Sequence, residues 1–203
     1  MNTAKDPRAV AAIVASALFM QNLDASVVAT ALPAMAHDLA VDPVHLSVAI
    51  TSYLVALCVF IPVSGWVADR FGARRVFMLA IVVFTGASAL VGLSQGLPSL
   101  VAARVLQGVG GAMMVPVGRL LLLRRVSKEE LVVAMTWLTM PGLLGPVFGP
   151  PVGGLLTDAF SWRAVFWLNI PVGILGLVLV WLFIPDVEKQ DPGPLDAKGL
   201  SLW

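Results

Sequence analysis

The sequence predicts an all-α integral membrane protein with six transmembrane helices. Of the 203 residues, 59% are hydrophobic and only 12% are charged, with a mean hydropathy of +0.92. Globular domains carry about 25% charged residues, so this chain has too few charges to cover a water-exposed surface. Long apolar stretches follow one another, and basic residues gather in alternate connections. Both patterns are typical of multi-pass membrane proteins.

Charge and cysteine content exclude several other classes. Thirteen Lys and Arg against twelve Asp and Glu leave a net charge of +1, which argues against a nucleic-acid binder. The single cysteine, Cys58, excludes an intramolecular disulfide. We find no Walker loop, zinc-protease His pair or nucleophile elbow, so we expect no enzyme, no metal and no cofactor.

Each predicted span holds the roughly 20 apolar residues that a membrane helix needs. The first is interpreted as a permanent helix rather than a cleaved signal, because its apolar run is too long for a signal-peptide core and more spans follow. The spans are residues 10–32, 46–67, 76–97, 100–122, 131–155 and 164–184.

The basic residues predict the orientation. Only Arg163 lies in the loops of one side, whereas the other side carries eleven basic residues: Lys5, Arg8, Arg70, Arg74, Arg75, Arg119, Arg124, Arg125, Lys128, Lys189 and Lys198. By the positive-inside rule both termini are cytoplasmic. We therefore expect a multi-pass protein of the plasma membrane, the inner membrane in a bacterium.

The chain divides into a bundle and a tail. Residues 1–185 are expected to form the six-helix bundle, and residues 186–194 a polar cytoplasmic linker rich in helix breakers. Residues 195–203 turn apolar again and are interpreted as the start of a truncated seventh helix.

An internal repeat organises the bundle. When the sequence is aligned with itself at a shift of 89 residues, segments 62–79 and 151–168 have nine identical positions. These include Asp69 with Asp158 and Arg74 with Arg163. Chance explains matching Val and Leu but poorly explains a shared acid and base at one spacing. Three spans separate the copies, so units 10–97 and 100–184 form an inverted 3+3 repeat, as found in major facilitator transporters.

Two charges lie deep inside predicted spans. A charge in the hydrocarbon costs at least about 2.5–3.5 kcal/mol, so Asp24 and Arg104 mark either a function or a static ion pair that locks two helices. Gln21 lies three residues before Asp24, and Gln107 lies three residues after Arg104, so each glutamine shares a helix face with one of the two charges. We favour an acid that binds and releases a proton under the control of a movable cation.

Glycines recur every four residues in the fifth span. Gly145, Gly149 and Gly153 form a flat stripe that another backbone can approach closely, and Pro146 and Gly154 accompany them. Glycine and proline are common in membrane helices, but that explains only one or two of these residues.

The connection between the second and third spans is tight and charged. Positive-inside anchoring alone could explain it, but the glycine spacing and embedded acid favour a cytoplasmic gate of salt bridges, formed by Gly65, Asp69, Arg70, Gly72, Arg74 and Arg75. By the repeat, Asp158 and Arg163 would form the outer counterpart of this gate.

These motifs resemble the major facilitator superfamily, specifically its fourteen-helix drug:proton antiporter branch. Gly65-x-x-Ala-Asp-Arg-x-Gly-x-Arg-Arg75 resembles the superfamily's loop signature, and Leu100-x3-Arg-x2-Gln-Gly-x-Gly-x-Ala112 resembles its helix-four motif. Gly145-Pro-x2-Gly-Pro-x2-Gly-Gly154 resembles the helix-five antiporter motif, and Leu23-Asp-x-Ser26 and Trp162-Arg-x2-Phe-x2-Asn169 resemble branch motifs. Ala73, Val67, Ala29 and Ala164 depart from the pattern.

The resemblance implies the N-terminal six-helix bundle of a rocker-switch transporter. Such a protein would export a hydrophobic or cationic drug in exchange for protons, together with a missing C-terminal half. An importer or symporter of the same superfamily, and a truncated membrane protein that does not transport, are the alternatives. We expect no transport by these 203 residues alone.

Overall fold

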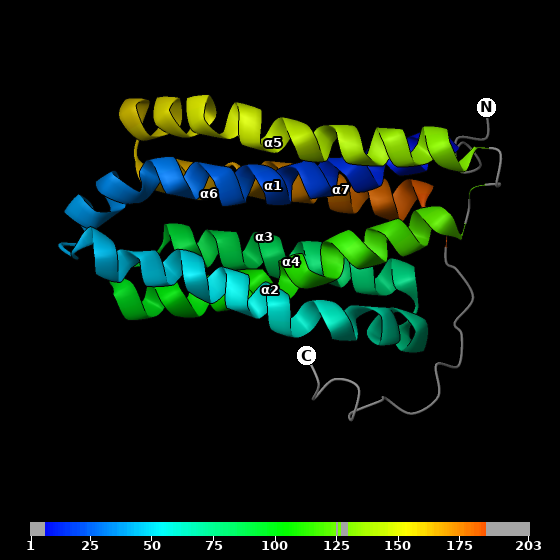
Figure 1. The fold of residues 1–203 in the computed structure, drawn as a ribbon, viewed down its shortest axis with the longest axis horizontal. Coiled ribbons are helices and arrows are strands. Elements are labelled where there is room, and N and C mark those ends of the chain that lie inside the picture. Colours follow the sequence, from blue (N-terminus) through cyan, green and yellow to red (C-terminus); the bar gives the residue numbers. More distant parts are fainter. Residues whose placement is uncertain (1–6, 125, 127–129, 186–203) are drawn as a thin grey trace.

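The computed structural model describes residues 7–124, 126 and 130–185, which form a bundle of long helices lying side by side (Figure 1). Six segments of this part are long and apolar enough to cross a membrane, which confirms the predicted fold class. The predicted linker 186–194 and helix start 195–203 lie outside the described residues. The helices are α1 (Pro7–Asp38), α2 (Pro43–Phe71), α3 (Ala73–Gly92), α4 (Leu97–Leu123), α5 (Leu131–Ala159), α6 (Trp162–Trp167) and α7 (Asn169–Phe183).

Several helices extend beyond the spans predicted from hydropathy, whereas α3 ends at Gly92, five residues before the predicted end of the third span. The first span was predicted to end at residue 32, but α1 continues through Pro33 to Asp38. Its 32 residues measure about 48 Å, well beyond a hydrocarbon core of about 30 Å. Hydropathy detects where a helix leaves the hydrocarbon, and the backbone can stay helical beyond that level.

The sixth span is two helices rather than the single predicted one. Ser161 caps α6 by accepting a hydrogen bond from the Arg163 amide at 3.1 Å, and the helix ends at Trp167. Pro171 lies in the first turn of α7, so it offers no N–H to the carbonyl of Trp167. The helix is therefore interrupted at Leu168, and α7 begins at Asn169.

Helix packing agrees with the inverted repeat. The repeat equates α1 with α4 and α2 with α5, and accordingly α1 packs chiefly on α5 while α4 packs on α2 and α3. Gly72 and Ser161, 89 residues apart, each stand immediately before the next helix, which starts at Ala73 and at Trp162. The two repeat copies therefore form equivalent turns at opposite ends of the bundle.

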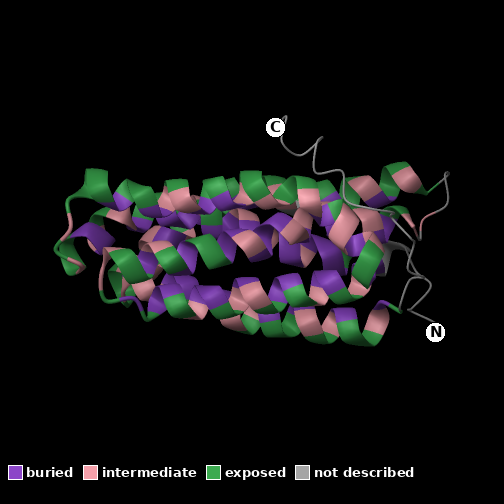
Figure 2. Ribbon diagram, turned by 90° about the horizontal axis from the view of Figure 1, so that it is seen from below, coloured by how far each residue is buried: buried purple, intermediate pink, exposed green. Residues whose placement is uncertain are grey.

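We call the end that contains Gly72 the basic end and the end that contains Ser161 the far end. The buried apolar side chains form two clusters, one including Met20 and Phe77 and one including Leu23 and Phe166. The clusters adjoin along α1, and the polar site described below lies at that level. The spans of α2 and α5 are the least buried, at 22% and 18%, and many of their exposed residues are large and apolar, as expected for surfaces that face lipid or another part of a membrane protein. Figure 2 shows exposed positions in green and buried positions in purple along the bundle.

Candidate functional site: a buried ion pair

The only two charges predicted deep in the membrane lie in direct contact. Arg104 on α4 donates from Nη1 to Oδ2 of Asp24 on α1 at 2.8 Å, and each residue is 1% exposed. Both charges were predicted from the sequence, and the structure brings them together. Two isolated charges at this depth would each carry a large desolvation cost, which pairing reduces.

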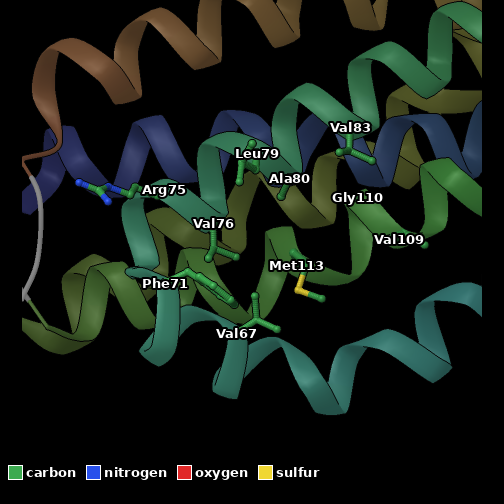
Figure 3. A pocket seen from close by; sticks show the side chains of 10 residues that line it. All are labelled: Val67, Phe71, Arg75, Val76, Leu79, Ala80, Val83, Val109, Gly110 and Met113. Atoms are coloured by element: carbon green, nitrogen blue, oxygen red, sulfur yellow. The ribbon is translucent and has the colours of Figure 1, made fainter. Parts of the chain in front are cut away.

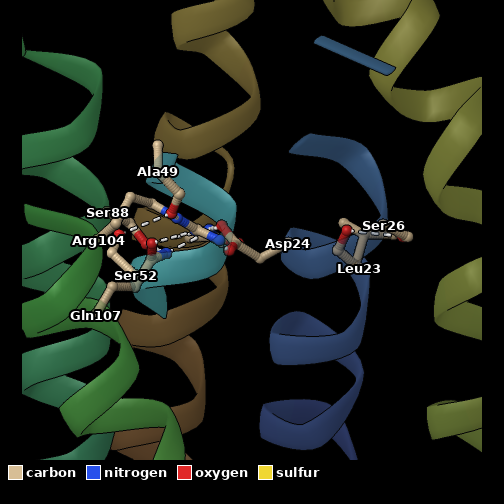
Figure 4. A network of polar contacts seen from close by, with 9 residues as sticks. Leu23, Asp24, Ser26, Ala49, Ser52, Ser88, Arg104 and Gln107 are labelled. Carbon is tan, nitrogen blue, oxygen red and sulfur yellow. Dashed lines mark hydrogen bonds and ion pairs between the residues drawn. The ribbon is translucent and has the colours of Figure 1, made fainter. Parts of the chain in front are cut away.

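Amide and hydroxyl groups complete the shell around the carboxylate (Figure 4). Gln107 donates from Nε2 to Asp24 Oδ1 at 3.0 Å, and its Oε1 accepts a 2.6 Å hydrogen bond from Arg104. Asn169, the first residue of α7, donates to the same Oδ1 at 2.7 Å. Ser88 Oγ on α3 lies 2.6 Å from the Gln107 amide nitrogen and 3.1 Å from that of Asn169. The Asp24 carboxylate thus accepts three hydrogen bonds from protein groups.

Helix α2 supports the cation from the other side. The guanidinium carbon of Arg104 lies 4.3 Å from the ring centroid of Tyr53, a cation–π distance. Arg104 Nε also lies 3.4 Å from the Ala49 carbonyl oxygen. The site is therefore built from α1, α2, α3, α4 and α7, and a shift of any one of them would alter it.

Gln21 was predicted to act with Asp24, but no hydrogen bond joins it to Asp24 or Arg104. Its side chain is buried one turn toward the basic end, and a methyl group built on Gly111 would lie 3.3 Å from its Nε2 and 3.2 Å from Tyr53 Oη. Gln21 thus belongs to the next layer of the bundle.

Three contributors to the site were not predicted from the sequence: Asn169, Ser88 and Tyr53. Asn169 was noticed only as part of a motif, although a polar amide inside an apolar stretch is itself a signal of a buried partner. Nothing in the local sequence distinguishes Ser88 or Tyr53 from other serine and tyrosine residues in membrane helices.

The glycine stripe of α5 positions the helix that carries Asp24. A Cβ built on Gly145 would lie 2.7 Å from Asn22 Cβ, and one on Gly149 or Gly153 would overlap Ser26 or Thr30 of α1. Ser26 Oγ donates to the Gly145 carbonyl at 3.1 Å across this contact. The predicted close approach is therefore present. Pro146 and Gly154, from the same motif, do not take part: Pro146 is exposed, and Gly154 has open space around it.

The predicted cytoplasmic gate residues gather at the basic end but make separate contacts. Asp69 Oδ1 accepts from Arg124 Nη2 of α4 at 2.5 Å, and Arg74 donates to the Trp181 carbonyl at 2.8 Å. Gly72 adopts φ 96°, a conformation that side chains disfavour, and so forms the tight turn between α2 and α3. The remaining members, Gly65, Arg70 and Arg75, are exposed.

At the far end Arg163, one of the two predicted outer-gate residues, pairs with Asp38. Arg163 donates to Oδ2 of Asp38 at 2.5 Å and stacks on Trp162, whose Nε1 donates to the same oxygen at 3.1 Å. Asp158 is exposed and forms no ion pair with any described residue. The local repeat places Asp158 close to Arg163 in sequence, but the extension of α1 beyond the predicted span brings Asp38 to the guanidinium instead.

Asp38 lies six residues beyond the predicted hydrocarbon segment 10–32, and it is accessible to solvent. The hydrogen bonds from Arg163 and then Trp162 lower the pKa of the Asp38 carboxyl below its ordinary value of 3.8. Asp38 is therefore a stable anion at neutral pH.

Comparison with known proteins places the chain in a family. The family model of the Major Facilitator Superfamily matches residues 14–202, nearly the whole chain. The chain belongs to this superfamily. The expectation of a transporter segment rather than an enzyme is thereby confirmed.

Relatives and solved structures agree with this assignment. The chain is 49% identical over 178 residues to MdtD, a proposed multidrug resistance protein of Escherichia coli (strain K12), and the match covers 88% of this chain and 38% of MdtD. MdtD of Shigella sonnei (strain Ss046) matches to the same extent. The chain thus spans well under half the length of these curated relatives.

Two crystal structures share the fold at low sequence identity. The human organic anion transporter MFSD10 superposes with a TM-score of 0.74 at 18% identity, covering 97% of this chain and 53% of that one. The POT family transporter PepTSo gives a TM-score of 0.78 at 16% identity, covering 95% of this chain and 40% of that one. The six-span bundle is therefore a recurring part of longer transporters.

Proposed function

We propose that this chain is the N-terminal half of a proton-coupled antiporter that exports hydrophobic or cationic drugs by rocker-switch alternating access. The observation that carries the proposal is the Asp24 carboxylate, which is buried at membrane depth against one cation and two amide donors. The name of its relative MdtD supports drugs as the class of substrate.

The geometry supplies a physical link between a proton and helix position. All three groups that contact the Asp24 carboxylate are donors, and a proton added to it removes the negative charge that attracts them, which favours the withdrawal of Arg104. Arg104 is held by α4 and Asn169 by α7, so withdrawal means that α1 moves relative to these helices. A cationic drug near Asp24 would compete with both Arg104 and the proton for the same negative charge.

The rest of the transport path belongs to a second half. Helices α2 and α5 expose rows of large apolar side chains, among them Val55 and Val59 on α2 and Leu143 and Val147 on α5. We assign these rows to contacts with the C-terminal half and with lipid, and we place the basic end at the cytoplasmic face of a bacterial inner membrane.

The test uses the complete transporter that contains this segment, in everted membrane vesicles with an imposed proton gradient. Asp24→Asn keeps the size of the side chain and should abolish proton-driven drug accumulation. Asp42→Asn changes an exposed acid that caps α2, a role that asparagine keeps, and should leave accumulation nearly unchanged. Full coupled transport by the Asp24→Asn protein would refute the proposal.

The same assay distinguishes the alternative functions. Proton-driven drug loss from everted vesicles would identify an importer or symporter. Drug flux mediated by the 203 residues alone would contradict the assignment as one half of a transporter, for which we expect none.

A further inference from the structure

A large cavity lies between α2, α3 and α4 near the basic end, away from the Asp24 site (Figure 3). Its volume is about 490 Å³, within the range of small-molecule sites. Nine of its ten lining residues are apolar, including Phe71 from α2, Leu79 and Val83 from α3, and Met113 from α4. The tenth is Arg75.

The cavity does not belong to the exposed row of α2. Val67 and Phe71 follow the buried Ser64 by three and seven residues, so they lie on the face of α2 that packs on α4. Leu79 is 62% exposed and Phe71 54% exposed, so the cavity opens to the outside of the bundle. In a membrane-spanning bundle, an apolar opening at this position meets lipid chains.

Arg75 gives the cavity a charged end. It stands in the first turn of α3, is exposed, and extends its guanidinium away from the apolar lining (Figure 3). Val83, at the other end of the α3 lining, is eight residues away, or about 12 Å along the helix. An arginine at a helix end reaches the headgroup level, where its planar guanidinium binds phosphate oxygens well.

We propose that this cavity binds an anionic phospholipid, with an acyl chain between α2, α3 and α4 and the phosphate at Arg75. The apolar lining selects a hydrocarbon chain, and the cation selects a net negative headgroup. A hydrophobic cationic drug fits the lining, but Arg75 repels its charge. The proposal is independent of transport, because it concerns the lipid-facing side of the bundle.

The experiment is lipid competition on the 203-residue chain in detergent, read by native mass spectrometry. Phosphatidylglycerol and phosphatidylcholine with identical acyl chains are added in equal amounts. One arginine near an anionic surface predicts a preference of about fivefold for phosphatidylglycerol. Arg75→Gln should abolish this preference, so that the two lipids bind about equally. Arg70 is exposed but does not line the cavity, so Arg70→Gln should preserve the preference.

A second variant tests the acyl-chain part of the site. Val83→Phe fills the cavity from a half-buried position and should lower the occupancy of both lipids without changing the helical content measured by circular dichroism. Equal binding of the two lipids by the unaltered chain, or an equal loss of preference in Arg70→Gln and Arg75→Gln, would overturn the proposal. Displacement of bound lipid by a cationic drug in the unaltered chain, but not in Val83→Phe, would instead assign the cavity to drugs.

Discussion

The centre and the ends of this bundle contain ion pairs that differ in burial and in the number of protein partners. At the centre, the side chains of Asp24 and Arg104 are 0% and 1% exposed, and protein groups donate three hydrogen bonds to the carboxylate. At the basic end, Asp69 and Arg124 are 27% and 15% exposed, and at the far end Asp38 and Arg163 are 46% and 27% exposed. Water can replace a lost partner at the ends but not at the centre. The cost of removing a partner should therefore rise with burial.

The largest effect is expected at the centre. Arg104→Gln leaves the Asp24 carboxylate buried without its cation and should destabilise the chain by about 3–5 kcal/mol in denaturant unfolding in micelles. Adding Asp24→Asn to this variant removes the orphaned charge and should restore much of the loss. A cost of Arg104→Gln below that of Asp69→Asn would contradict the comparison.

The amide donors should rank next. Asn169→Ala removes one hydrogen bond to the carboxylate, and a bond to a charged group contributes about 1.5–3 kcal/mol. The matched control is Asn22→Ala on α1, because the Asn22 amide donates only to the Leu18 carbonyl of its own helix. The same unfolding assay should show a clearly smaller loss for Asn22→Ala; equal losses would mean that the contact with Asp24 adds nothing.

A smaller effect is expected at the basic end. Asp69→Asn removes the negative charge that pairs with Arg124 where water can enter, and should cost about 0–1 kcal/mol. This loss should shrink as salt is raised, since salt screens exposed pairs more than buried ones. The free energy of unfolding of Asp69→Asn and Arg104→Gln at low and high salt tests this difference. A strong salt dependence of the loss caused by Arg104→Gln would contradict it.

The smallest effect is expected at the far end. Arg163→Gln should change the unfolding midpoint less than Asp69→Asn does at neutral pH. Because Arg163 lowers the pKa of Asp38, this pair stabilises the fold fully above the ordinary value of 3.8, and its contribution disappears as pH falls through the lowered value. The difference between Arg163→Gln and the unaltered chain should therefore shrink in strong acid to the part that comes from stacking on Trp162 and the hydrogen bond to the Ser94 carbonyl; a difference that grows on acidification would contradict this sign.

The fold was predictable from particular residues. Apolar stretches of membrane length predicted six spans, and the recurrence of Asp69 and Arg74 as Asp158 and Arg163 predicted the inverted repeat that the turns at Gly72 and Ser161 reproduce. The break at Leu168 was missed because hydropathy does not respond to a single interrupted turn. The extension of α1 to Asp38 was missed because helical structure continues beyond the point where hydropathy falls.

The candidate site was predictable in part. A charge inside a membrane needs a partner, so the positions of Asp24 and Arg104 predicted a site at their level. The spacing of Gly145, Gly149 and Gly153 predicted a close contact between helices. Their additional partners were not predictable in the same way. Asn169 lies 145 residues from Asp24 in sequence, and the rotation and offset of α7 decide whether its amide faces the carboxylate.

The sequence by itself determined that this chain spans a membrane six times, that it repeats itself in inverted form and that two charges lie within it. Composition, spacing and solvation energy are properties of the residues and their order, and no contact is needed to evaluate them. Only the tertiary structure decided that Asn169, Gln107 and Ser88 complete the Asp24 shell, that Arg163 contacts Asp38 rather than Asp158, and that Arg75 borders an apolar cavity. Each of these depends on how helices are rotated and offset against one another, which is set by the packing of the whole bundle.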